Sequence, residues 1–375
     1  MISPPSFGVM RGSRGRAAAL ACCFVAAAFA ARGQSDSMDT FGGDPDKNSW
    51  LWIPADTPDW TRHFHIGAIV GLNIKADFSM NGTFDIAGNA IANGNYSDGY
   101  VHPGNNSFGQ TGSWGYNNAS QYNPTGGSDG LGSVAMHSAT AYTTANSSQQ
   151  DGGPFAGFDM VYGDNLFYWK HARVGWELGF SLLPVIINNS VSSSAKVNQS
   201  TFTFNTGGII MPQAPYRGGS GGQAPTISDH PVVTQDTVDG TVTGTEELDV
   251  MVYALRFGPS FYWDLNEHLG FSMSGGPAVG IVSGSYQFNE VVSTPASGTT
   301  PAVNTRNNGG SDETHVVYGG YVNGTLMYHV INDADFYLSA QYMPMGSATF
   351  SDGGREGKLD LGGQVYISVG ISWPF

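Results

Sequence analysis

The chain has 375 residues, of which only 12% are charged, about half the usual share, while 53 are glycine. Its 15 Lys and Arg residues are outnumbered by 30 Asp and Glu residues, so the net charge is −15 and a basic nucleic-acid-binding face is excluded. The 17 Tyr, 21 Phe and 8 Trp residues exclude a mainly disordered chain, because solvated coils contain few aromatics. This glycine-, serine- and aromatic-rich composition favours β-structure.

The N-terminus has the layout of an export signal. An apolar stretch covers residues 17–30 and ends in Ala28-Phe29-Ala30, a cleavage-site pattern of small residues. It is too short for a membrane-spanning helix, and three arginines precede it: Arg11, Arg14 and Arg16. We therefore predict that residues 1–33 are a secretory signal peptide that is removed.

Both cysteines, Cys22 and Cys23, lie inside this predicted signal peptide. The mature chain would then hold no disulfide and no thiolate metal site, although it is exported. Residues 34–62 contain three prolines and no regular periodicity, so we expect an irregular periplasmic segment there.

From His63 onward the sequence changes to a repeat of two residues. The clearest example places apolar residues on one face, namely Val174, Trp176, Leu178, Phe180 and Leu182. The first run extends from Phe64 to Ile74, and the others lie at about 155–165, 171–187, 246–263, 269–289, 314–330, 336–349 and 358–375. Alternation over this many residues predicts strands rather than helices.

The connections between the predicted strands alternate between short and long. Short turns at 166–170, 264–268 and 331–335 are interspersed with long connections at about 78–154, 188–245 and 290–313. Membrane-spanning barrels of outer membranes have this asymmetry, with short periplasmic turns and long external loops. Residues 63–375 are therefore expected to form an all-β, transmembrane, antiparallel up-and-down β-barrel of eight strands.

A count of ten strands stays open. Residues Thr111 to Tyr116 and Leu131 to Thr143, in the first long connection, have strand-like patterns, but Ser, Asn and Gly dominate them. We interpret them as a hairpin that extends above the membrane.

The C-terminal strand carries the most specific pattern. Its alternate residues are apolar and share one face: Val365, Ile367, Val369, Ile371, Trp373 and Phe375. This strand resembles the terminal strand of bacterial outer-membrane β-barrel proteins, of the small OmpA/OmpX-like or porin-like class. The resemblance implies location in the bacterial outer membrane, contact with outer-membrane lipid, and insertion by the barrel-assembly machinery. Pro374 departs from the family's pattern, which a strand terminus tolerates.

Aromatic residues gather near both ends of the predicted strands, as they do at the two interfaces of a bilayer. One group lies next to the short turns: Trp169, Trp263, Tyr328 and Phe336. The other lies toward the opposite strand ends: Tyr286, Tyr318 and Tyr342. We interpret the two groups as aromatic girdles.

Few charges fall on the faces that are predicted to point inward. They are the cationic Lys75, Arg173 and Arg256 and the acidic Asp159 and Glu177. Buried charges pair or hydrate, and side chains fill the interior of an eight-stranded barrel. We interpret the five as a salt-bridged network that closes the lumen. A selectivity filter stays open as the alternative, because the many inward Gly and Ser residues leave room for water.

Catalysis would need a nucleophile, a base and an orienting group within reach of one another. Residues of suitable types lie scattered over predicted external segments: Asp98, His102, Ser311, Asp312 and His315. His63 and His65 share a strand face, but no third metal ligand is near them in sequence. We predict no enzyme activity, no metal site and no cofactor.

The sequence therefore favours an integral outer-membrane β-barrel whose long external loops give it a structural or surface-interaction role, with no nucleic-acid partner. One alternative is an outer-membrane channel that passes small solutes. Another is a secreted, soluble β-sandwich that binds glycans through aromatic loops. The loops do not identify their external ligand.

Overall fold

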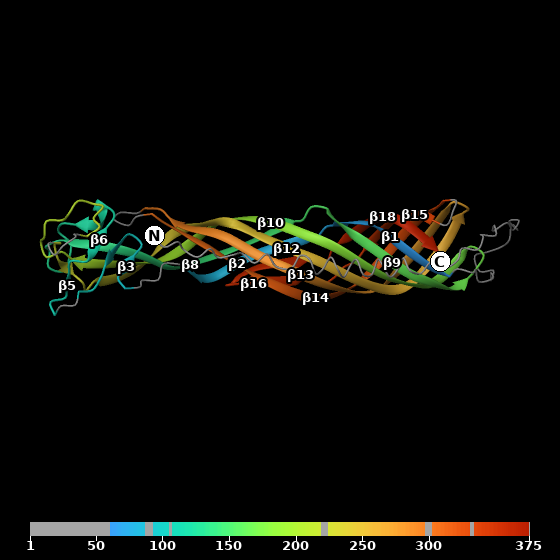
Figure 1. Cartoon of the computed structure of the whole chain (residues 1–375), viewed down its shortest axis with the longest axis horizontal. Coiled ribbons are helices and arrows are strands. Elements are labelled where there is room, and N and C mark those ends of the chain that lie inside the picture. The colour runs from blue at the N-terminus through green and yellow to red at the C-terminus, as the bar shows by residue number, and fades with distance from the viewer. Residues whose placement is uncertain are drawn as a thin grey trace, which may run out of the picture.

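A computed structural model describes residues 61–86, 93–104, 107–218, 224–296, 302–330 and 334–374, and these form an elongated, almost entirely β molecule (Figure 1). The predicted signal peptide, residues 34–60 and Phe375 lie outside the described residues. Among the described residues, none belongs to a helix that is long and apolar enough to cross a membrane.

The main sheet is antiparallel and has thirteen strands. Four are long: β10 (Ala172–Asn205), β12 (Val232–Asn266), β13 (Leu269–Thr294) and β14 (Val303–Val330). The shorter ones are β1 (Arg62–Leu72), β2 (Lys75–Asp85), β7 (Tyr122–Asn123), β8 (Ser133–Asp151), β9 (Phe155–Tyr168), β15 (Ala334–Tyr342), β16 (Ala348–Asp352), β17 (Arg355–Asp360) and β18 (Val365–Pro374).

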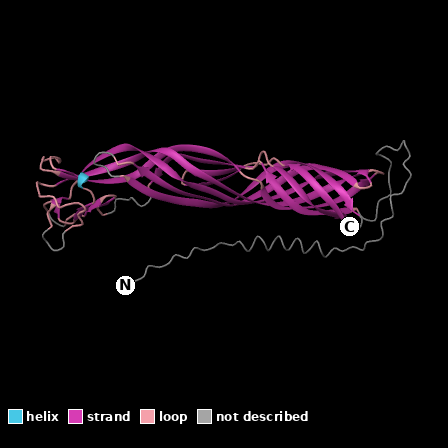
Figure 2. Ribbon diagram, turned by 90° about the horizontal axis from the view of Figure 1, so that it is seen from above, coloured by secondary structure: helices cyan, strands magenta, loops and turns pink. Residues whose placement is uncertain are grey.

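The pairings of the main sheet return to their starting point, because β12 pairs with β10 as well as with β13. Around one end the neighbours are β10, β12, β13, β14, β15, β18, β1 and β9, and β9 pairs again with β10. Toward the other end, β8, β2 and β17 take the places of β9, β1 and β18, respectively, in this circuit of neighbours. Figure 2 shows two sections of crossing strands that lie end to end along the molecule.

The lower section consists of β1, β9, β15 and β18 with residues 172–182, 253–266, 269–282 and 316–330 of the long strands. The extension consists of β2, β8, β16 and β17 with residues 188–205, 232–249, 283–294 and 303–314. The waist is the level between them.

The number of strands differs from the eight that the sequence predicts. In the described residues, four passes of the chain are broken near the waist into the pairs β1–β2, β8–β9, β15–β16 and β17–β18, and β7 adds a further strand. The prediction of long irregular connections at 188–245 and 290–313 is wrong, because β10, β12, β13 and β14 continue through most of them. Leu131 to Thr143 likewise falls largely within β8, a strand of the main sheet.

The two faces of the long strands exchange polarity at the waist. In the lower section of β10, Leu178 points outward and is exposed, whereas Glu177 is buried inside. In the extension of the same strand, Ser190 points outward and Val191 is buried. The outside is therefore apolar in the lower section and polar in the extension.

An apolar cluster fills the interior at the waist. Its members come from nine of the thirteen strands of the main sheet and from adjoining loops, and include Ile69, Leu183, Val252, Met345 and Tyr366. Ile69 and Leu183 are only 2% and 1% exposed, and burial of such a side chain contributes about 1.5–3 kcal/mol. The cluster both stabilises the fold and occupies the interior between the lower section and the extension.

A small cap covers the far end of the extension (Figure 1). It consists of described residues between 93 and 132 and between 206 and 231, and its elements are short: β3 (Asn95–Tyr96), β4 (Gly99–Val101), β5 (Gln110–Thr111), β6 (Trp114–Tyr116), the 3-10 helix η1 (Ala119–Gln121) and β11 (Ile227–Ser228). Its core packs Trp114 and Tyr116 against Met136 of β8 and Phe204 of β10. Trp114 Nε1 also donates to the carbonyl of Pro225 at 2.7 Å.

Candidate functional site

The centre of the lower section holds a two-bond ion pair. Arg256 Nη1 and Nη2 donate to the two carboxylate oxygens of Asp159, both at 2.9 Å. The side chains come from β12 and β9, which are separated by β10, and each is 4% exposed. Gly179 of β10 lies between them, and a Cβ there would approach the Arg256 guanidinium closer than 3.0 Å. The glycine therefore makes room for the ion pair.

A second group of titratable side chains lies beside this pair. Glu177 Oε1 lies 3.6 Å from His63 Nε2, and the His65 ring is 5.1 Å from the His63 ring and 5.3 Å from the Tyr337 ring. No cluster of three or more His, Cys, Asp or Glu side chains within the described residues is arranged to hold a metal ion.

The other two cations of the predicted network lie elsewhere. Arg173 pairs with Asp264 at 2.9 Å near the β12–β13 turn and lies over the Tyr262 ring. Lys75 pairs with Asp151 at 3.1 Å near the waist. Four residues of strand separate Arg173 from Glu177, which is about 13 Å and beyond the reach of a direct contact. Three of the five residues are therefore brought together, and the other two pair locally.

Large side chains from other strands cover the glycines on the inward faces of the sheet. A Cβ at any of these glycines would come closer than 3.0 Å to a side chain from another strand. The pairs are Gly67 with Tyr337, Gly163 with His63, Gly179 with Arg256, Gly270 with Tyr262, and Gly357 with Tyr286. Small residues on the inward faces could leave an open lumen, but large side chains occupy the space beside these glycines.

The extension has a buried charge cluster of its own, which the sequence analysis missed. Arg355 donates to Glu290 and to the Tyr142 hydroxyl, and Tyr142 donates to Glu290. The guanidinium also lies 4.4 Å from the ring centres of both Phe84 and Phe288. Its three polar residues come from separate segments, β8, β13 and β17, and no local pattern in the sequence brings them together.

These contacts shift the protonation equilibria of the extension. Burial raises the pKa of Tyr142, and the adjacent Glu290 carboxylate raises it further. For Arg355, burial alone would lower the pKa, but its hydrogen bond with Glu290 and the charge of that carboxylate raise it overall. The cluster is therefore held as a neutral phenol beside an ion pair.

Tyr286 belongs to the interior rather than to a girdle. It is fully buried, and its hydroxyl donates to Glu246 at 2.7 Å, which Asn189 Nδ2 also contacts at 2.7 Å. Its assignment to the upper girdle is wrong because, in the alternation along β13, it shares the inward face with Ser272. Burial, followed by the Glu246 charge, raises the pKa of Tyr286.

The remaining girdle residues lie on or near the outer surface. Trp169 is half-buried in the β9–β10 turn, and the others are exposed: Trp263, Tyr318, Tyr328, Phe336 and Tyr342.

On the C-terminal strand β18, the predicted apolar face points outward. Ile367, Val369 and Ile371 are exposed, while Val365 and Trp373 are partly buried. This strand pairs with β1 and β15.

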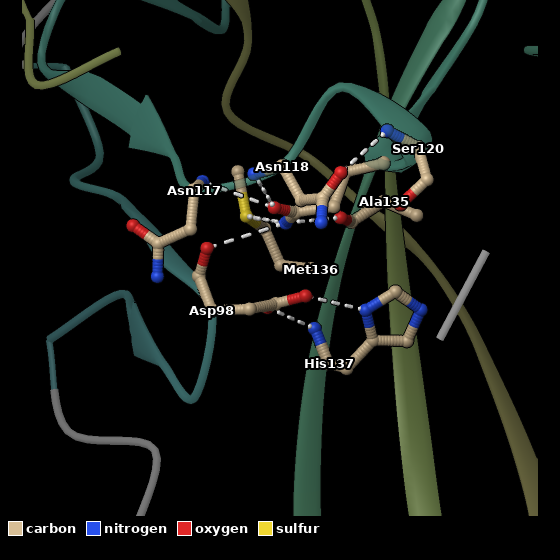
Figure 3. Close-up of polar contacts among 8 residues, drawn as sticks. Asp98, Asn117, Asn118, Ser120, Ala135, Met136 and His137 are labelled. Carbon is tan, nitrogen blue, oxygen red and sulfur yellow. Dashed lines mark hydrogen bonds and ion pairs between the residues drawn. The ribbon is translucent and has the colours of Figure 1, made fainter. Parts of the chain in front are cut away.

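The cap is attached to β8 through a buried polar hub (Figure 3). Asp98 accepts hydrogen bonds from the His137 backbone N–H at 2.8 Å and pairs with the His137 ring at 2.6 Å. Gln121 Nε2 donates to the carbonyls of Asp98 and Ala135, and its Oε1 accepts from Asn118 N–H. These bonds fix the cap to the end of the extension.

The scattered residues of catalytic type lie in three separate places. Asp98 pairs with His137, whereas His102 contacts Ser113 and Asn95. On β14, His315 lies 3.0 Å from Glu313, and Ser311 shares that strand face while Asp312 points to the other.

Comparison with known proteins gave structural neighbours only. No protein-family model and no curated protein sequence matches this chain. The neighbours are outer-membrane β-barrel proteins. The outer membrane protease OmpT of Escherichia coli is 11% identical, with 87% of this chain and 100% of that chain covered and a TM-score of 0.29. A FadL homologue of Pseudomonas aeruginosa is 11% identical (84% and 90% covered, TM-score 0.18), and the toluene transporter TodX of P. putida is 9% identical (85% and 91%, TM-score 0.16).

Proposed function

We propose that the protein is an integral outer-membrane β-barrel protein with a structural or surface-interaction role. In this proposal the eight strand segments of the lower section span the bilayer, and the extension carries the cap away from the cell. Outer-membrane lipid surrounds the lower section, and the barrel-assembly machinery inserts it through β18. The predicted signal peptide directs export.

The observation that carries the proposal is the confinement of exposed apolar residues on the main sheet largely to the lower section. They recur on its long and short strands alike: Leu178, Leu255, Phe257, Met273, Val279, Ile281, Val316, Val322, Leu326, Leu338, Ile367, Val369 and Ile371. Soluble proteins rarely expose so large an apolar surface, whereas barrels in outer membranes carry an apolar outer band about 25 Å tall. The extension, which is polar outside and apolar inside, has the surface expected in water.

The filled interior supports a closed barrel over the rival channel. The waist cluster and the large side chains above the inward glycines occupy the path that a solute would take. We expect negligible conductance for the wild-type protein in planar bilayers, and the same for Glu177→Gln, which removes the carboxylate charge beside His63 and should lower the unfolding midpoint. Steady wild-type conductance with a changed ion selectivity in Glu177→Gln would favour the channel.

The proposed orientation is tested by cysteine labelling, because the mature chain would contain no cysteine of its own. Ser190→Cys places a thiol on the outer face of the extension, and His268→Cys places one at the β12–β13 turn. A membrane-impermeant maleimide should label Ser190→Cys in intact cells and His268→Cys only after lysis. Labelling of both in intact cells, or the reverse pattern, would contradict the proposed topology.

A further inference from the structure

A polar pocket opens at the upper end of the extension, where β8, β10 and β12 lie side by side. Its volume is about 320 Å³, and Thr140, Asn198, Gln199 and Asp236 contribute to its wall. It forms where the register between β8 and β10 shifts at Asn198 and Gln199, which leaves Thr140 as an extra, exposed residue. The pocket is therefore a product of a strand irregularity, and such irregularities often redirect side chains.

The pocket lies well beyond the apolar outer surface. Twelve residues of β10 separate Asn198 from Ile186, the last exposed apolar residue of that strand below it, which corresponds to about 40 Å along the strand. If the lower section spans the bilayer, as proposed above, the pocket faces the external medium. The inference that follows rests on that proposed function.

The wall of the pocket offers both donors and acceptors and little charge. Its described lining consists of amide, hydroxyl and carboxylate side chains, and Asp236 is the one charged member. Asn198 accepts a hydrogen bond from Thr237 Oγ1 at 3.2 Å through Oδ1, which leaves its amide nitrogen as a donor. Asp236 accepts from Thr237 N–H at 2.8 Å through Oδ1, which leaves its second oxygen as an acceptor.

Gln199 contributes a buried donor to the lining of the pocket. The residue is 5% exposed, lines the pocket, and its amide Nε2 has no hydrogen-bond partner among the described residues. A buried donor without a partner is unfavourable, and native structures satisfy nearly all such groups. Hydroxyl or carbonyl oxygens of a bound molecule would satisfy it.

We propose that this pocket binds a neutral saccharide unit. Sugar hydroxyls donate and accept at once, as do the side chains of the wall, and a pocket of this volume lies at the small end of ligand sites. Anions are disfavoured because the described lining includes no Lys or Arg, and apolar ligands because it includes no apolar side chain. A Ca²⁺ ion would need six to eight oxygen ligands, usually with several carboxylates, and this wall supplies one.

The experiment uses the full-length protein in detergent and two saccharide probes. One probe is a panel of biotinylated neutral tetrasaccharides of hexose and N-acetylhexosamine, and the other is the lipid-free polysaccharide of the cell's own lipopolysaccharide. Saturable binding of the first indicates a glycan of another organism, and binding of the second indicates the cell's own envelope. Either supports the proposal, provided that Asp236→Asn weakens binding about tenfold or more.

Two further variants make the result specific. Gln199→Met keeps the size of the buried side chain while removing its donor, and it should weaken binding without changing the heat-modified gel migration of the folded protein. Gln287→Ala, an exposed amide on β13 of the same extension, is the matched control and should bind as wild type. Absence of binding, or equal binding by all the variants, overturns the saccharide site, while cysteine labelling tests the proposed orientation separately.

Discussion

Arg256 and Asp159 are 97 residues apart in sequence, lie on strands that do not pair, and still make two parallel hydrogen bonds across the face of β10. The guanidinium and carboxylate match in geometry, so the bonds fix the relative positions of β9 and β12. Both groups are almost fully buried. Neither can lose its partner without leaving a charge in a poorly solvated place.

Removing one partner of this pair should destabilise the protein strongly. Asp159→Leu leaves Arg256 buried without its counter-charge, and we expect a loss of about 3–5 kcal/mol in the free energy of unfolding. The measurement is urea unfolding in lipid vesicles. The double variant Asp159→Leu/Arg256→Met removes both charges and should recover much of the loss. A single variant as stable as wild type would show that the pair contributes little.

A cation on the outer face should be tolerated in the extension but not in the lower section. Leu178 and Ser190 lie on the same face of β10, twelve residues apart. Leu178→Arg should cost about 2–4 kcal/mol on refolding into vesicles, because it places a charge in hydrocarbon. Ser190→Arg should cost close to nothing. Equal costs for the two would mean that the apolar surface is not in contact with lipid.

Stability should fall at high pH because of the buried phenols of the extension. In the unfolded chain a tyrosine ionises near pH 10, whereas burial raises the pKa of Tyr286 in the folded protein. The stabilisation that this shift provides is fully present below pH 10 and is lost as the pH rises toward the folded pKa. Unfolding midpoints between pH 8 and pH 11 should therefore fall less steeply for Tyr286→Phe. Identical slopes would contradict this assignment.

The terminal aromatic residue should matter for assembly. Deletion of Phe375 should reduce the amount of protein in the outer-membrane fraction, because the resemblance of the last strand implies that the assembly machinery recognises it. Deletion of the exposed Phe108 in the cap is the control and should leave insertion unchanged. Normal insertion of the truncated chain would contradict the prediction.

The strands of the lower section could be predicted because their outward residues are apolar and alternate with small or polar ones. The extension has the same period, but on β10 its apolar face includes small residues such as Ala195, and its polar face is dense in Ser and Asn. That composition is also typical of loops, so the alternation was hidden. Beyond the waist the apolar face points inward, so the assumption that apolar residues point outward predicts the wrong face for Tyr286.

The inward position of Arg256, Asp159 and Glu177 follows from alternation, but their partners do not. Partner choice depends on the height of each residue in the closed circuit and on the space that Gly179 leaves open. The Arg355–Glu290 pair depends in addition on β17 and β13 facing each other across the extension, which no local pattern encodes.

The exchange of polarity at the waist also constrains the register of the sheet in both sections of each long strand. A shift of a single residue between two neighbouring strands turns every side chain of one strand to the opposite face. On β10, such a slip would turn Glu177 to the apolar outer face of the lower section and Val191 to the polar outer face of the extension. Both side chains would be misplaced together. The misaligned strand would therefore be destabilised in the lower section and in the extension at once, with no compensating stabilisation in either. Strands of this length, which have many possible alignments, are thereby left with one favourable alignment.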